Sequence, residues 1–339
     1  MLVLLACASP EPIPDTAAAG FDYSGHVFER FETTLVDGFL CPDAYDPEGA
    51  ADVQHIDCAI EGENERDPGD APDEIVVMAY NAERGQRLDE QLAAFGTTVP
   101  VPDVLLLSEA DRGCSRSGGA NVTQAYAERL GMNWAYAVEF VELPRDSGGG
   151  GIDETCEHGN AVLSRYPLGN VSQIRHAENL SWYIPPEERD GGGQPRLGGR
   201  IAVAADLAIG DRYVHVVVVH FESELSAFDI QAAQAVETAE HAAAQPYGVV
   251  VGGDTNAPYY TFDLATDTQN DETIAAFTDR GFEDAHASLD LEDRGTAGAL
   301  IIDLVLGRDV DLSDPEICEV EVCGELSDHL PLWATAGLR

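Results

Sequence analysis

The sequence predicts a domain that combines β-strands and α-helices around a large core. From residue 74 onwards, short runs of apolar and mostly β-branched residues alternate with helical stretches. Several of these runs are apolar throughout, which is typical of strands that are covered on both faces. With 339 residues, of which 44% are hydrophobic, the chain can bury such a core without depending on crosslinks alone.

Six segments have the length and composition of β-strands. They are rich in Val, Ile and Leu, and turn-forming or polar residues separate them. In chain order these strands are predicted over residues 75–80, 104–107, 201–207, 213–219, 249–251 and 301–306.

Two further segments are predicted to be helices. Residues 121–130 precede Gly131, and glycine commonly ends a helix because it adopts a left-handed backbone conformation without strain. Residues 226–243 begin with Ser226 and carry Asp229 three residues later, a pattern similar to a capping box.

The chain before residue 74 lacks this regular pattern. Residues 1–6 are an apolar run that is too short to span a bilayer. The run leads into Cys7 through Leu-Leu-Ala, which resembles the cleavage box of bacterial lipoproteins, and an ordinary signal peptide is the alternative. We therefore predict an export-type start and tether over 1–20, an extension over 21–73 and a main domain over 74–339.

Six cysteines remain when Cys7 is set aside, and an even number after an export-type start is typical of an oxidising compartment. We therefore expect an extracellular, outer-surface or periplasmic location, with attachment to a membrane surface if Cys7 is lipidated. Free thiols in a cytosolic protein are the alternative, and the sequence alone does not select a pairing. Local spacing favours the disulfides Cys41–Cys58, Cys114–Cys156 and Cys318–Cys323.

The formal net charge is −44, and all 18 basic residues are arginines. Such a surface repels polyanions and disfavours long stretches of nucleic acid, whose binding usually depends on Lys and Arg contacts with phosphates. Adaptation to a salty environment, where acidic surfaces stay soluble and charges are screened, is the favoured explanation of the charge. The charge therefore disfavours a nucleic-acid partner without excluding one.

Polar residues stand at the ends of the predicted strands. One such residue is usually a turn or a cap, but here five strands carry polar groups towards one place. Asp303 lies within the apolar run 301–306, where an ionised carboxylate would be costly without a partner. The whole set is Asn81, Glu109, His220, Asp254, Asn256, Asp303, Asp328 and His329.

This ordered set resembles the endonuclease/exonuclease/phosphatase superfamily, which includes pancreatic-type deoxyribonuclease and bacterial sphingomyelinases. Each motif alone is weak, but together and in the family's order the motifs are specific. The matching segments are MAYN at 78–81, LLSEADR at 106–112, HGNAVLSRYP at 158–167, VVHFES at 218–223, GGDTNAP at 252–258, IIDLVL at 301–306 and SDHLP at 327–331.

The resemblance implies an α+β fold, a four-layer α/β/β/α sandwich of two packed, mainly antiparallel sheets with the active site at the sheet edges. It covers roughly residues 74–337, the predicted catalytic domain, and leaves the extension unexplained. Val218 stands where the family often has Thr, and Thr255 where it often has Phe. These departures put the branch of the family in doubt, but not the scaffold.

The resemblance also implies a hydrolase that cleaves a phosphate ester with a divalent ion, Mg²⁺ or else Mn²⁺ or Ca²⁺. A hard cation bound by carboxylate and amide oxygens neutralises the charge that builds up on phosphate oxygens during attack. Glu109 is the first choice as a metal ligand, with Asn81 beside it and Asp328 as a further ligand.

The other residues of the set are the candidate catalytic groups. Asp254 and Asn256 can face the same side of an extended segment, where one activates the attacking water and the other holds a phosphate oxygen. His329, oriented by Asp303, would act as general base or stabilise charge. His220 would bind the phosphate or protonate the leaving oxygen, and the sequence leaves open which histidine does which.

The substrate is left open among nucleic acid, a phospholipid head group or sphingomyelin, and a small organic phosphate. Small and lipid phosphodiesters are slightly favoured, because they need no basic groove. A surface binding protein that kept the scaffold and lost the chemistry is an alternative, as is a secreted toxin that recognises a host partner through residues 21–73. The complete polar set argues against lost chemistry. We expect a monomer.

Overall fold

The computed structural model describes residues 21–42, 54–144, 155–185, 188, 194–224, 227–262 and 271–339. Residues 1–20, with Cys7, and also Ser226 lie outside these ranges. The export-type start, the lipidation of Cys7 and the Ser226 cap therefore stay predictions. Among the described helices, none is both long and apolar enough to cross a membrane.

The strands form one sheet of eight and one of six. The order in the first is β1 (Glu61–Glu63), β4 (Asn133–Glu142), β5 (Cys156–Ser164), β3 (Val104–Arg112), β2 (Glu74–Asn81), β14 (Leu332–Gly337) and β13 (Asp311–Ile317), with β7 (Arg196–Gly198) paired to β4. The order in the second is β11 (Glu283–Asp284), β12 (Leu300–Arg308), β10 (Val249–Tyr260), β9 (Arg212–His220), β8 (Ile201–Ile209) and β6 (Leu168–Arg175). Each sheet has one parallel pair, β2 with β3 and β9 with β10, and is otherwise antiparallel.

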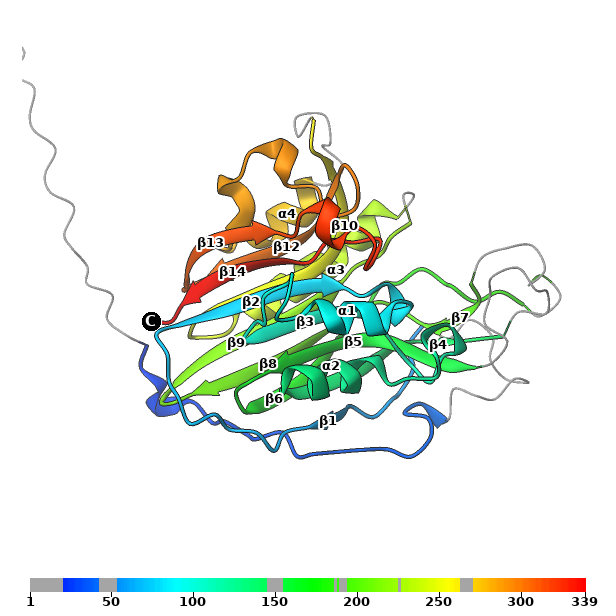
Figure 1. The fold of residues 1–339 in the computed structure, drawn as a ribbon, viewed down its shortest axis with the longest axis horizontal. Helices are drawn as coiled ribbons and strands as arrows, with labels where there is room; N and C mark the ends of the chain where they lie inside the picture. Colours follow the sequence, from blue (N-terminus) through cyan, green and yellow to red (C-terminus); the bar gives the residue numbers. More distant parts are fainter. Residues whose placement is uncertain are drawn as a thin grey trace, which may run out of the picture.

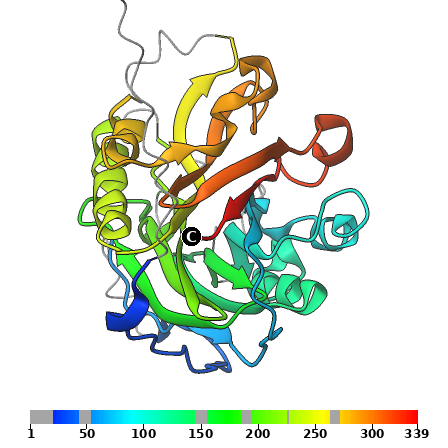
Figure 2. The same cartoon turned by 90° about the vertical axis from the view of Figure 1, so that its left-hand side faces the viewer.

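The two sheets pack face to face, and helices cover their outer faces (Figure 1). Helices α1 (Leu88–Ala94) and α2 (Val122–Leu130) lie against the eight-stranded sheet, and α3 (Phe228–Ala243) and α4 (Asp271–Thr278) lie against the other. A fifth helix, α5 (Val320–Cys323), is a single turn before β14. Figure 2 shows the two helix pairs on opposite sides of the molecule. The predicted four-layer sandwich is confirmed.

The central strands are apolar at nearly every position because both of their faces are covered. In β2, Ile75, Val77 and Ala79 pack between the sheets, whereas Met78 and Tyr80 pack under α1 and α2. Alternate residues of a strand point to opposite faces, so each face of β2 needs its own apolar set.

The predicted elements are all present, and each strand is longer than predicted. The largest difference is β10, which was expected over 249–251 and continues to Tyr260. In α2 the Asn121 side chain accepts a hydrogen bond from the Gln124 N–H (3.1 Å), and Gly131 ends the helix with φ of 71°. Helix α3 begins at Phe228, two residues later than predicted, after an Ala227 cap position that offers no side-chain acceptor.

The described part of the extension lies along the sandwich. Its strand β1 pairs with β4 and so forms an edge of the eight-stranded sheet. Arg112 of β3 binds the Glu61 carboxylate of β1 (2.7 Å) and the Glu157 carboxylate of β5 (3.0 Å). The extension therefore shares a sheet with the main domain, and the boundary at residue 74 stays a prediction.

The three predicted disulfides are confirmed. Cys41–Cys58 lies in the extension, and Cys114–Cys156 joins the segment after β3 to the start of β5. Cys318–Cys323 closes a short loop before β14. Three disulfides are compatible with an extracellular or periplasmic location.

Candidate active site

Three polar residues of the six-stranded sheet lie side by side near the end of its central strands. Asp254 of β10 pairs in register with His220 of β9 on one side and with Asp303 of β12 on the other. Each of the three is at most 2% exposed. Residues at paired positions point to the same face, and this row faces the second sheet.

The backbone before Asp254 requires a glycine. Gly253 has φ of +132°, and a Cβ atom there would lie 2.2 Å from the carbonyl oxygen of Val219. Only glycine adopts this conformation without strain, which is why the second Gly of the GGD segment stands directly before the carboxylate.

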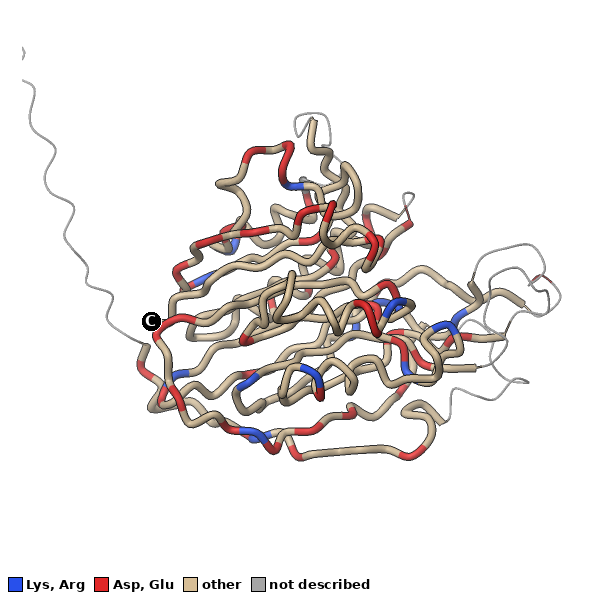
Figure 3. The backbone as a smooth tube through the Cα atoms, in the orientation of Figure 1, with Lys and Arg blue, Asp and Glu red and all other residues tan. Residues whose placement is uncertain are grey.

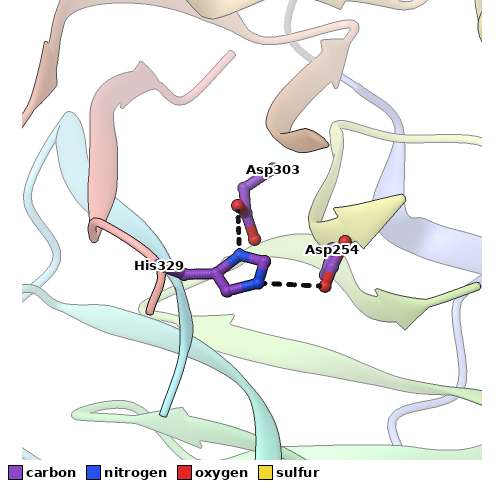
Figure 4. A group of neighbouring side chains, drawn as sticks. All are labelled: Asp254, Asp303 and His329. Carbon is purple, nitrogen blue, oxygen red and sulfur yellow. Dashed lines mark hydrogen bonds and ion pairs between the residues drawn. The ribbon is translucent and has the colours of Figure 1, made fainter. Parts of the chain in front are cut away.

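His329 lies between two of these carboxylates (Figure 4). Its Nδ1 is 2.7 Å from Oδ2 of Asp303, and its Nε2 is 3.8 Å from Oδ2 of Asp254. Burial alone would lower the pKa of His329, but Asp303 and then Asp254 outweigh it and hold the pKa well above its usual range. Burial and then Asp303 raise the pKa of Asp254. An imidazolium paired with Asp303 beside a basic carboxylate is suited to moving a proton.

The eight-stranded sheet supplies Asn81 and Glu109 from the opposite side. Asn81 ends β2, and its Nδ2 donates to Oδ2 of Asp254 (3.1 Å) across the sandwich. Glu109 lies in β3 with its Oε1 3.7 Å from Nε2 of His220 and its Oε2 3.5 Å from Nε of Arg84. Burial favours the neutral acid, yet Arg84 and then His220 hold the pKa of Glu109 well below its usual range.

The last two predicted residues lie at the margin of this group. The Asn256 N–H donates to Oδ1 of Asp254 (2.8 Å), but its side-chain Nδ2 donates to the carbonyl of Phe221 (3.1 Å). Its φ of 48° departs from the extended geometry that the prediction assumed. Asp328 is exposed, and burial and then Asp328 raise the pKa of the nearby Glu83.

The sequence analysis missed Glu139 of β4. Its Oε2 is 3.2 Å from Nδ1 of His220, and its Oε1 is 2.6 Å from Nη1 of Arg200. Arg200 Nη1 in turn lies 2.8 Å from Nε2 of His220. Burial alone would raise the pKa of Glu139, but His220 and then Arg200 lower it to about 2. Glu139 therefore holds both side chains in place as a carboxylate.

A second buried network adjoins the site on the eight-stranded sheet. Arg116 binds Asp111 (2.6 Å) and Glu142 (2.9 Å), and Asp111 binds Nδ1 of His158 (2.9 Å). Phe140 stacks on His158 with 6.3 Å between ring centroids, and the Arg200 guanidinium lies 5.3 Å from the same Phe140 ring, so this network lies close to the site. The motif at 158–167 contains His158, but its spacing gave no sign of the Asp111 partner.

Unusual backbone conformations gather at this end of the sandwich. Among the described residues, seven non-glycine residues have positive φ, and four of them, Glu83, Arg84, Glu109 and Asn256, belong to the site. Such conformations cost free energy and persist where the surrounding structure enforces them. Their clustering supports a functional role for this region.

The residues present fit a hard divalent cation. Glu109 and Asn81 offer carboxylate and amide oxygens, the ligands that Mg²⁺, Mn²⁺ and Ca²⁺ prefer. Asp254, Asp303 and His329 also have potential ligand atoms within 4.8 Å of one another. One carboxylate oxygen of Asp303 is buried without a hydrogen-bond partner, so this group also has an unused oxygen that could bind a metal ion.

The fold and the site define a hydrolase scaffold of the class that acts on phosphate esters. The chain belongs to the Endonuclease/Exonuclease/phosphatase family, whose model matches residues 78–329. Members of this family hydrolyse phosphoester bonds and generally use divalent metal ions. No curated protein sequence matches the chain.

Solved structures agree with this assignment at the level of the fold. An endonuclease/exonuclease/phosphatase from Beutenbergia cavernae is similar with a TM-score of 0.56 and 20% identity, over 79% of this chain and 72% of that one. The human Nocturnin catalytic domain with bound sulfate is similar with a TM-score of 0.50 and 17% identity, over 83% of this chain and 98% of that domain.

Proposed function

We propose that the protein is a secreted, divalent-metal-dependent hydrolase of phosphodiesters that prefers small or lipid phosphodiesters to long nucleic acids. One observation carries this proposal. Asp254, His220 and Asp303 form a buried row on one sheet, and Asn81 and Glu109 meet that row from the other sheet. Family membership supplies the reaction class, and the three disulfides support secretion.

Glu109 and Asn81 would hold the divalent ion, with Asp328 close to the entrance. When bound, the ion would neutralise negative charge on the phosphoryl oxygens. Arg200 would contact the same phosphoryl group, since it lies against His220, which in turn lies beside Glu109 and Asp254.

Asp254 would accept the proton of the attacking water. Burial and the Asp303 carboxylate raise its pKa, so it is a stronger base than an exposed aspartate. Asn81 Nδ2 donates to Asp254 Oδ2 and would fix the orientation of this base.

His329 would be protonated at the start of the reaction and give its Nε2 proton to the leaving oxygen, while Asp303 holds Nδ1. His220 would hold Arg200 in place rather than transfer a proton, since Glu139 and Arg200 occupy its two ring nitrogens. Of the two histidines, His329 is therefore the better proton carrier.

The distribution of charge supports a small or lipid substrate. Acidic residues are spread over the described part of the molecule (Figure 3). Arg84 and Arg200 lie at the site, beside Glu109 and His220 respectively. A single phosphodiester meets these two arginines, but a polyanion that extends past the site meets the acidic surface.

The test is hydrolysis of bis-p-nitrophenyl phosphate, sphingomyelin and supercoiled plasmid by the oxidised protein with Mg²⁺, Mn²⁺ or Ca²⁺, and with chelator. We expect chelator-sensitive cleavage, fastest on one of the first two substrates.

Asp254→Asn and His329→Gln should each lower kcat by about 10²–10⁴-fold. Asp314→Asn, at an exposed site on β13, is the matched control and should leave kcat unchanged. Full activity in both site variants would refute the assignment, and no turnover with any metal would favour a binding protein on the same scaffold.

A further inference from the structure

A second cluster of histidines lies away from the candidate active site. His215 of β9 points towards α3, on the same face as Val217 and Val219, whereas His220 faces the other sheet. Nε2 of His215 lies 3.2 Å from Nε2 of His241, which belongs to the last turn of α3. Two ring nitrogens therefore face each other between the sheet and the helix.

A carboxylate fixes the orientation of one ring. Asp206 of β8 lies opposite His215 in the sheet, and its Oδ1 is 2.7 Å from Nδ1 of His215. A proton on Nδ1 that is donated to Asp206 leaves the lone pair of Nε2 directed at His241. Metal-binding histidines in proteins are commonly held by a carboxylate in this way.

The separation of the two nitrogens suits a metal ion between them. Zn²⁺–N bonds of 2.0–2.1 Å in a tetrahedral site place two ligand nitrogens about 3.3 Å apart. The last turn of a helix also favours positive charge.

We propose that His215 and His241 form an accessory site for Zn²⁺ or a similar borderline divalent ion, with Asp206 as the supporting carboxylate and water as the remaining ligands. His241 is only half-buried, which leaves room for water on its side. The bound ion would tie α3 to β9. This site is independent of the phosphoesterase proposal, because it lies on the opposite face of the sheet.

Zinc binding to the whole chain tests the proposal without reference to activity. The protein is freed of metal with chelator and titrated with Zn²⁺ by calorimetry in millimolar Mg²⁺, which occupies sites that prefer hard cations. Wild type should bind one more Zn²⁺ than His241→Gln, and its Tm should rise with Zn²⁺ by more than that of the variant. Asp206→Asn should retain the site with roughly 10–100-fold weaker affinity.

The matched control is His176→Gln. His176 is also buried and lies 3.2 Å from a carboxylate, that of Glu237, but its ring packs against Phe221 rather than a second histidine. This variant should bind Zn²⁺ like wild type. Co²⁺ added to wild type gives a readout that needs no variant, since four-coordinate ligation produces strong visible absorption. Equal Zn²⁺ stoichiometry in wild type and His241→Gln, or absent Co²⁺ bands, would show that the two rings share only a hydrogen bond.

Discussion

Each histidine of the candidate active site is held by a carboxylate. Asp303 binds Nδ1 of His329, and Glu139 lies against Nδ1 of His220. The two carboxylates have different surroundings, because Glu139 also binds Arg200 whereas one oxygen of Asp303 is buried without a partner. The negative charge of Asp303 is therefore compensated chiefly by His329, which explains why the pKa of that histidine is raised.

The first residue-level prediction concerns Asp303→Asn. An amide in place of the carboxylate would no longer hold His329 as an imidazolium, so kcat on bis-p-nitrophenyl phosphate should fall by about 10²–10⁴-fold. KM should change far less, because Arg200 would still bind the phosphate. The alkaline limit of the pH profile, which His329 sets, should also move to lower pH, because the pKa of His329 falls without Asp303. If the Tm of the variant falls so far that loss of folded protein accounts for the loss of activity, the role of Asp303 would instead be purely structural.

The second residue-level prediction concerns Glu142. Burial alone would raise its pKa, but Arg196 and then Arg116 lower it from 4.5 to about 2. A lowered pKa stabilises the fold above pH 4.5, and this stabilisation is lost as pH falls from 4.5 towards 2. Glu142→Gln should therefore reduce the free energy of unfolding at pH 7 by about 3 kcal/mol.

Urea unfolding at several pH values measures this effect. The difference in the free energy of unfolding between wild type and Glu142→Gln should shrink as pH falls below 4.5. Glu321→Gln, at an exposed glutamate of α5, should differ little from wild type at any pH. A Glu142→Gln difference that stays constant down to pH 2 would contradict the assigned ion pairs.

At the scale of elements, three bulges shape the active site. Glu109 lies at a register shift of β3 against β5, Glu139 at one of β4 against β5, and Asn256 at one of β10 against β12. A bulge adds one or more residues to one strand of a pair and redirects a side chain. Two of these residues, Glu109 and Asn256, also have positive φ.

These bulges explain what sequence reasoning could and could not predict. Strands, sheet packing and most site residues follow from apolar runs and from polar residues at strand ends. Glu139 stands inside an apolar run at 134–141, where it has the pattern of an ordinary strand residue. Its place beside His220 depends on a register shift and on tertiary pairing, neither of which leaves a local pattern. The extended geometry expected at Asn256 was wrong for the same reason.

The element-level prediction concerns the loop that carries Asp328 and His329. The Cys318–Cys323 disulfide joins two cysteines that lie five positions apart, just before this loop. The Cys318 N–H donates to the carbonyl of Pro331, just after the loop (2.9 Å). Replacing both cysteines with serine should cost about 2 kcal/mol of stability. The kcat of the folded variant should also fall, because the disulfide helps to position the loop that carries His329.

Denaturant unfolding and kcat of the double serine variant check this expectation, with the Cys41→Ser/Cys58→Ser variant as control. That pair lies in the extension, so its loss should lower stability and leave kcat of the folded protein nearly unchanged. Equal kcat in the two variants would show that the Cys318–Cys323 disulfide does not position the catalytic loop.

At the scale of the whole molecule, the charge is strongly unbalanced. The net charge is −44, and many of the arginines are already paired with carboxylates in the fold. Repulsion among the remaining acidic groups destabilises the compact state, since unfolding moves them apart. The buried ion pairs are shielded from solvent, so salt should act mainly on the surface repulsion.

Salt should therefore raise the stability of this protein at neutral pH. The screening length falls from about 10 Å at 0.1 M to about 3 Å at 1 M, which is shorter than most spacings between surface carboxylates. We expect the Tm measured by calorimetry to rise steadily with KCl over this range. Chloride is preferred to sulfate, because sulfate also strengthens apolar burial.

The control is the same titration near pH 4.1, the isoelectric point, where net repulsion vanishes and the rise in Tm should disappear. A rise of equal size at both pH values would mean that salt acts on apolar burial rather than on charge, and a falling Tm at neutral pH would mean that favourable ion pairs outweigh the surface repulsion.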